Sequence, residues 1–158
     1  MNEIEIVDLD QSHFKDACRI HVDPRTNRHH PHPPTADDFV AMFAAWLQAV
    51  ETDGFGYFAA VENGRCIGVG GVCKKRSPAG EYYNNLYFRV DADHQGKGVA
   101  TLLRQAGLRQ AASNHWPLIA MADAQNGASL HMIKRLGLVP LDDHKLEDEG
   151  RLVFHLPE

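Results

Sequence analysis

Hydrophobic and polar residues alternate over several short stretches of the chain, and this alternation predicts β-strands. Residues 3–9 alternate in the manner of a half-buried strand. Residues 56–62 and 66–74 are apolar and rich in β-branched side chains, and the Asn63-Gly64 pair between them is a strong hairpin signal. Further strands are expected to end near Val90 and to span residues 118–122 and 151–156.

Four other stretches carry apolar residues at spacings of three and four, which predicts helices. A short helix is expected to begin near Ser12, and a longer one after a capping box at residues 35–38. A third begins near Val99 and a fourth after Asn126, whose side chain can cap it. This fourth helix is expected to carry an apolar stripe of Ala128, Met132 and Leu136 and to end at Gly137.

The resulting element order is β-α-α-β-β-β-α-β-α-β-β, without an internal repeat. With 158 residues and 44% hydrophobic content, the chain has the size of one domain with a single core, so residues 1–158 are expected to form one domain. A net charge of -5 argues against general nucleic-acid binding, which needs a basic surface. A neutral or cationic small substrate fits this charge better.

The cysteine content bears on the cellular compartment. Cys18, Cys66 and Cys73 are odd in number and lack C-x-x-C spacing, which indicates neither a disulfide framework nor a cysteine zinc site. The chain does not open with a signal-peptide pattern, and none of its apolar runs approaches the roughly 20 residues of a membrane span. We therefore expect a cytoplasmic protein with reduced thiols and no membrane partner.

The stretch from Gln95 to Ala100 joins a predicted strand to a predicted helix and contains two glycines. A helix N-terminus carries unpaired N–H groups and a partial positive charge, and glycine lets an anion approach them closely. A Walker A motif is absent, and Thr101 stands where a dinucleotide fingerprint has its third glycine. The stretch predicts a pyrophosphate-binding loop of another kind.

Two motifs resemble those of the GNAT superfamily of N-acetyltransferases. Gln95, Gly98 and Ala100 match its acyl-coenzyme A loop, [RQ]-x-x-G-x-[GA]. Residues 126–138 are similar to its later motif, N-x-x-A-x-x-x-Y-x-x-x-G-F, in the expected order along the chain. The resemblance implies an α/β (α+β) fold with a mixed, mostly antiparallel central sheet flanked by helices.

The resemblance also implies an activity. Acetyl-coenzyme A would be the co-substrate, and a primary amine of a small molecule or peptide would attack its thioester directly, without a cysteine nucleophile. A non-catalytic domain that binds or senses acyl-coenzyme A is the alternative, and the sequence leaves a homodimer open. By resemblance, main-chain groups of Phe88 and Val90, freed at a bulge, would bind the pantetheine arm. The remaining coenzyme-binding residues implied are Gln95, Gly96, Lys97, Gly98, Val99, Ala100, Thr101 and Asn126.

Catalytic residues are harder to assign, because Ile133 stands where many family members have the tyrosine that protonates the leaving thiolate. Glu81 is the first candidate for a base acting through water, although a glutamate at the start of a strand is more often simply exposed. Asn84 could orient a water molecule. Tyr83 is a further candidate, with packing as its alternative role.

Residues 24–34 contain four prolines and are expected to form a loop, which carries His29, His30 and His32. Adjacent histidines tend to diverge, and no cysteine or close carboxylate completes a tetrahedral set, so we predict no metal site. By resemblance the loop borders the acceptor side of the cleft. It either recognises the acceptor or is a plain exposed loop.

Overall fold

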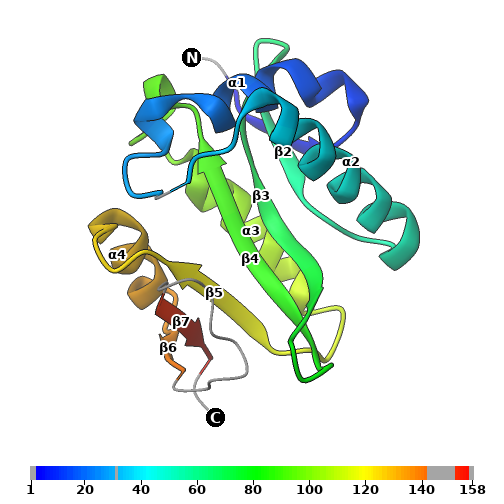
Figure 1. Cartoon of the computed structure of the whole chain (residues 1–158), viewed down its shortest axis with the longest axis vertical. Coiled ribbons are helices and arrows are strands. Elements are labelled where there is room, and N and C mark those ends of the chain that lie inside the picture. The colour runs from blue at the N-terminus through cyan, green and yellow to red at the C-terminus, as the bar shows by residue number, and fades with distance from the viewer. Residues whose placement is uncertain (1–2, 31, 142–151, 157–158) are drawn as a thin grey trace.

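The computed structural model describes residues 3–30, 32–141 and 152–156. The predicted order of strands and helices is confirmed (Figure 1). The elements are β1 (Glu5–Asp8), α1 (Phe14–Val22), α2 (Ala36–Asp53), β2 (Phe58–Glu62), β3 (Arg65–Arg76), β4 (Tyr82–Val90), α3 (Val99–Ala111), β5 (Leu118–Ala122), α4 (Gly127–Arg135), β6 (Val139–Pro140) and β7 (Leu152–His155).

The strands form one seven-stranded sheet in the order β1-β2-β3-β4-β5-β7-β6. Neighbours pair antiparallel except β4 and β5, which are parallel. The predicted mixed, mostly antiparallel sheet is therefore confirmed. The parallel pair lies at the centre because the crossover through α3 returns the chain to the edge of β4.

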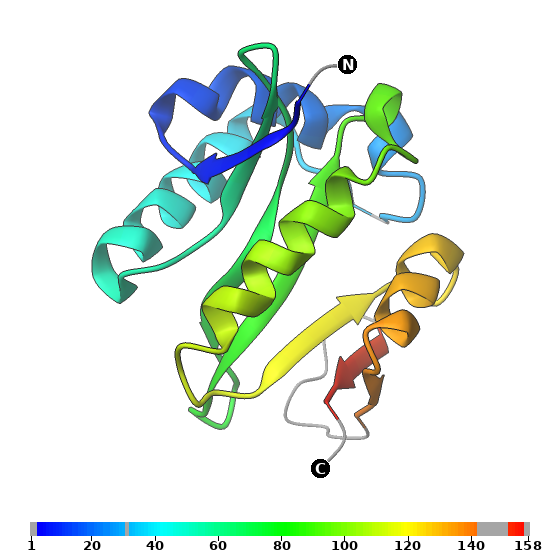
Figure 2. The ribbon, with the colours of Figure 1, turned by 180° about the vertical axis from the view of Figure 1, so that it is seen from behind.

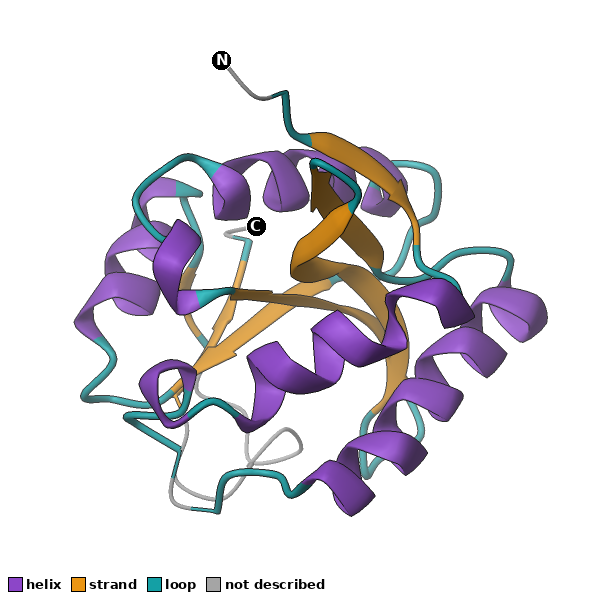
Figure 3. Ribbon diagram, turned by 90° about the horizontal axis from the view of Figure 1, so that it is seen from above, coloured by secondary structure: helices purple, strands orange, loops and turns teal. Residues whose placement is uncertain are grey.

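Helices cover both faces of the sheet (Figures 2 and 3). On one face, α1 and α2 bury an aromatic cluster against β2 and β3 that includes Phe39, Phe43 and Trp46. On the other face, Val99 and Leu103 of α3 pack against Ile67 and Val90 of the sheet. A third cluster joins α3 and α4 to β4, β5 and β7.

Most of the predicted local signals act as expected. Thr35 accepts the Asp38 N–H, and the Asp38 side chain accepts the Thr35 N–H, which completes the capping box at α2. Asn63 and Gly64 both have positive φ, at 53° and 76°, as a tight hairpin turn between β2 and β3 requires. The proline-rich stretch is not wholly irregular, because residues Pro24–Thr26 form a short 3-10 helix whose N-cap is Asp23.

The buried side of α4 differs from the predicted one. Ala128 is exposed, whereas Ile133 is buried between α4 and β5. Leu130 and Leu136 pack against the same cluster, so the apolar face follows the spacing 130, 133 and 136. Apart from Leu136, the predicted stripe was wrong, because a nine-residue helix carries apolar residues on more than one face, and only its contact with the sheet selects the buried one.

Candidate active site

The two central strands part from each other halfway along β4. Residues 84–86 of β4 pair with residues 118–120 of β5, but β4 continues to Val90 without β5 beside it. Figures 1 and 2 both show β5 turning away from β4 toward its C-terminal end. Residues 87–90 of β4 therefore have an unpaired edge on the side of β5.

Main-chain groups of Phe88 and Val90 face this opening. Asn84 N–H donates to the Pro117 carbonyl on the β5 side at 2.8 Å, while Asp91 N–H donates to the Ile67 carbonyl on the β3 side at 2.9 Å. Because successive residues of a strand point their main-chain groups to opposite sides, even-numbered residues of β4 face β5. The Val90 carbonyl also accepts a bond from Gln95 Nε2 at 3.4 Å.

The predicted bulge is wrong as the origin of these free groups. The β3–β4 register runs without a shift from Gly68 opposite Val90 to Arg76 opposite Tyr82. The register shift near this region lies between β2 and β3, at Ala60 and Val61. Divergence of β4 from β5, and not a bulge in β4, leaves the edge unpaired.

The glycine loop lies where β4 leads into α3. Gly96 and Gly98 have φ values of 79° and 82°, and a Cβ built on either glycine would meet no atom within 4 Å. Gly98 is the N-cap of α3 and offers no side-chain hydrogen bond, so the first N–H groups of the helix lack a capping partner. The buried Nε of Arg104, in the next turn of the helix, has no partner either. The loop thus fits a pyrophosphate group.

Side chains of the other loop residues divide between core and surface. Val99 is buried against Leu103, so only its main chain faces the loop, whereas Lys97 is exposed. Across the opening, Asn126 follows β5, and its Oδ1 accepts the Ser129 N–H at 3.2 Å. Its predicted role as a helix cap is confirmed, and a contact between Asn126 and the coenzyme stays a prediction.

Polar and aromatic side chains line the face of β4 that α1 and α2 cover, and the sequence analysis did not predict their contacts. His21 Nδ1 lies 2.7 Å from the Ala17 carbonyl, which can only accept, so Nδ1 carries the proton. His21 Nε2 then accepts the Tyr87 hydroxyl at 2.7 Å. Burial, reinforced by the charge of Arg89, lowers the pKa of His21 to about 3, so the ring is neutral.

Further polar side chains lie on the same face of β4, on either side of Tyr87. The Asn85 amide donates to the buried Tyr57 hydroxyl at 3.0 Å, and the Arg89 guanidinium donates to Asn27 Oδ1 at 2.8 Å. Odd-numbered residues of β4 therefore face α1 and α2. Polar alternation in this strand was the available signal, but their partners come from residues more than 25 positions away, which only the fold brings together.

The three catalytic candidates lie toward the opposite end of β4. Asn84 is completely buried, and its amide bonds to Asn114 and to the Trp116 carbonyl, contacts that favour a structural role. Tyr83 is half-buried, and Glu81 is exposed just before β4 begins. Counted from Leu86, where the pairing stops, Tyr83 lies about 10 Å and Glu81 about 17 Å further down the strand.

Ile133 and the histidine loop complete the predicted site residues. Ile133 is 2% exposed and lies within the cluster below α4, so the position of the family's tyrosine is part of the core. His29, His30 and His32 are exposed in the loop between α1 and α2. In the part of the chain that the structure describes, no three His, Cys, Asp or Glu side chains are grouped to hold a metal ion.

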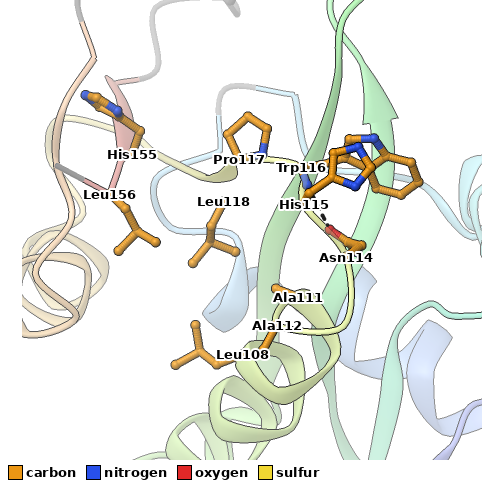
Figure 4. Close-up of a pocket in the computed structure, with 10 residues that line it drawn as sticks. All are labelled: Leu108, Ala111, Ala112, Asn114, His115, Trp116, Pro117, Leu118, His155 and Leu156. Carbon is orange, nitrogen blue, oxygen red and sulfur yellow. Dashed lines mark hydrogen bonds between the residues drawn. The ribbon is translucent and has the colours of Figure 1, made fainter. Parts of the chain in front are cut away.

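A hollow of about 350 Å³ opens at the other end of the sheet (Figure 4). Leu108 of α3, Leu118 of β5 and Leu156 beyond β7 contribute to its apolar lining. Because Asn84 pairs with Leu118, this hollow lies at the paired end of β4, away from the glycine loop. It does not form part of the candidate site.

None of the helices among the described residues is long and apolar enough to cross a membrane.

Comparisons with known proteins agree with this geometry. The family model of the acetyltransferase (GNAT) domain matches residues 3–139. No curated protein matches the chain in sequence. An acetyltransferase from Agrobacterium tumefaciens str. C58 is similar in structure, with 19% identity, a TM-score of 0.76 and coverage of 100% of this chain and 93% of that chain.

Two further solved structures share the fold. Ribosomal-protein-alanine N-acetyltransferase from Brucella melitensis has 19% identity and a TM-score of 0.76, with 96% of this chain and 98% of that chain covered. A Salmonella typhimurium protein, solved with its cofactor acetyl-CoA, has 20% identity and a TM-score of 0.70, with 96% and 91% covered. The match to the family model shows that the chain belongs to the GNAT acetyltransferases, whose co-substrate is acetyl-coenzyme A.

Proposed function

We propose that this protein transfers an acetyl group from acetyl-coenzyme A to a primary amine of a small molecule or peptide. The observation that carries the proposal is the unpaired edge of β4 beside a glycine-capped helix start. The unpaired edge supplies main-chain groups for an extended amide chain, and the start of the helix supplies N–H groups for a pyrophosphate. The three free thiols, Cys18, Cys66 and Cys73, support the predicted cytoplasmic location.

In this proposal the loop from Gln95 to Thr101 binds the pyrophosphate through main-chain N–H groups. Phe88 and Val90 hydrogen-bond the pantetheine amides, and Asn126 approaches the same arm from the far side of the opening. Acetyl-coenzyme A supplies the activated thioester, whose thiolate the acceptor amine displaces directly. A main-chain N–H of the freed β4 edge polarises the thioester carbonyl.

The acceptor amine approaches along the face of β4 that carries Tyr87. Tyr87 is one residue beyond the last β4–β5 pair, and its hydroxyl donates to the neutral His21 ring. A role of Glu81 or Tyr83 in proton transfer runs through water, because both lie well below the opening. We assign Asn84 no proton in the reaction, since its amide is occupied within the core.

A second candidate function is acyl-coenzyme A binding without catalysis. The buried position of Ile133 favours it, because no hydroxyl stands at the position of the family's tyrosine to protonate a leaving thiolate. Such a domain would keep the loop and the unpaired edge and would bind the same coenzyme.

A thiol-release assay separates the two. Protein supplied with acetyl-coenzyme A and a panel of primary amines is expected to release free coenzyme A in proportion to the acetylated amine found by mass spectrometry. Calorimetry of acetyl-coenzyme A binding runs in parallel. Tight binding without acetylated product for any amine would support the non-catalytic alternative, and absence of binding would contradict both.

A further inference from the structure

Arg89 stands out on the face of β4 that α1 and α2 cover. It is half-buried, and its Nη1 donates to Asn27 Oδ1 at 2.8 Å and to the Thr26 carbonyl at 3.2 Å. Both acceptors belong to the chain that follows α1, and Asn27 is itself buried. These two bonds fix the guanidinium from one side.

The other side of the guanidinium has no hydrogen-bond partner among the described residues. Arg89 makes no further hydrogen bond within the described residues, and neither its Nε nor its Nη2 is among their buried unpaired atoms. Both groups therefore keep some exposure to solvent. The Nε–H and Nη2–H pair forms the planar fork that binds a carboxylate in a bidentate manner.

The charge of Arg89 also lacks compensation. Arg19 pairs with Asp91, and Arg25 pairs with Asp23 and Asp93, but no described carboxylate lies within ion-pair distance of Arg89. The adjoining loop adds Arg28 and three histidines without an acidic residue between Asn27 and Thr35. A half-buried cation without a counter-ion is costly unless an anion arrives with a ligand.

We propose that Arg89 binds a carboxylate of the acceptor, so that the substrate is an amine that also carries a carboxylate. The inference rests on the proposed function, because it needs the acceptor on this face of the strand. Arg89 and Tyr87 share the face at a spacing of about 7 Å. The guanidinium would thereby hold the acceptor with its amine directed toward Tyr87 and the opening.

The test uses pairs of amines that differ only in a carboxylate or a carboxamide: aspartate and asparagine, glutamate and glutamine, glycine and glycinamide, and β-alanine and β-alaninamide. In the full-length protein with saturating acetyl-coenzyme A, we expect kcat/KM to favour the carboxylate at least tenfold in one or more pairs. Thermal shifts of the coenzyme-loaded protein report binding independently of turnover.

Arg89→Gln should remove this preference while leaving the Kd for acetyl-coenzyme A unchanged, and Arg89→Lys should keep part of it. Arg109→Gln, at an exposed position of α3, is the matched control and should keep all of it. A residue that only holds the loop would reduce both members of a pair equally, and that result would overturn the inference.

Two other outcomes would also overturn it: a preference that survives Arg89→Gln, or no carboxylate-selective turnover or binding in any pair. Failure of the protein to bind acetyl-coenzyme A is a separate result, because it would contradict the proposed function. In that case, carboxylate-selective thermal stabilisation of the coenzyme-free protein that Arg89→Gln abolishes would still support the assignment of Arg89.

Discussion

Gly98 combines a left-handed backbone with open space above it, and both properties serve anion binding. A glutamate there would place a side chain and a negative charge where the pyrophosphate is proposed to lie. We predict that Gly98→Glu abolishes acetyl-coenzyme A binding, measured by calorimetry, while the far-ultraviolet circular dichroism stays native.

The matched control is Gly54→Glu. Gly54 has φ +80°, also has no atom within 4 Å of an added Cβ, and ends α2 rather than beginning α3. Its variant bears the same backbone strain, about 1–2 kcal/mol, and the same charge. Equal loss of coenzyme binding in both variants would mean that strain, not the loop, explains the effect.

His21 makes stability depend on pH. Its pKa falls from 6.5 to about 3 on folding, so the unfolded chain takes up a proton that the folded chain excludes. This contribution is complete above pH 6.5 and is lost as the pH falls toward 3. Between pH 7 and pH 5, the free energy of unfolding should fall by about 2 kcal/mol through His21.

Urea unfolding at these two pH values checks the prediction. The free energy of unfolding of His21→Gln should fall less over this interval than that of the native sequence, whatever its absolute value. His131→Gln, which changes an exposed histidine, should keep the native slope. Parallel slopes in all three proteins would show that His21 is not excluded from protonation.

At the scale of elements, the backbones of α3 and β3 approach each other closely at Gly107 and Gly71, where no side chain lies between them. A Cβ on Gly107 would lie 2.8 Å from the Cα of Gly71 and 2.9 Å from its carbonyl carbon. Alanine in a helix interior normally stabilises by about 1 kcal/mol relative to glycine. Here we predict the opposite sign, because α3 must move away from the backbone of β3.

Chemical denaturation of Gly107→Ala should show a loss of at least about 1 kcal/mol. Gly127→Ala is the control, since an added Cβ in the first turn of α4 meets nothing within 4 Å. Its stability should be unchanged or slightly increased. A stabilised Gly107→Ala would mean that helix and strand separate easily.

Elements and caps were predictable because short-range signals decide them. The Asn63-Gly64 turn, the Thr35 cap and the glycine loop each depend on residues a few positions apart. The site beyond the coenzyme loop was not, because His21 meets Tyr87 across 66 positions and Arg89 meets Asn27 across 62. Periodicity gives the face of a strand, but not what covers it.

At the scale of the whole molecule, the coenzyme and the acceptor are proposed to reach β4 from different sides. We propose that the loop with His29, His30 and His32 lies on the acceptor side, because it directly follows Asn27, which binds Arg89. Replacing the three histidines with alanine should raise KM for the acceptor several-fold and leave KM for acetyl-coenzyme A unchanged.

His115→Ala, beside the hollow at the far end of the sheet, should change neither KM and serves as the control. Steady-state kinetics with each substrate varied in turn provides the measurement. Equal losses for both substrates in the triple variant would assign the loop a structural role.

The short ladder between β4 and β5 has a consequence for how the molecule holds together. Three residue pairs and one shared apolar cluster join the part from β1 to β4 to the part from β5 to β7. A ligand bound to β4 on one side and to α4 on the other would link both parts like an added strand. Coenzyme binding should therefore make unfolding more cooperative and slow amide exchange in β7, a strand on the far side of β5.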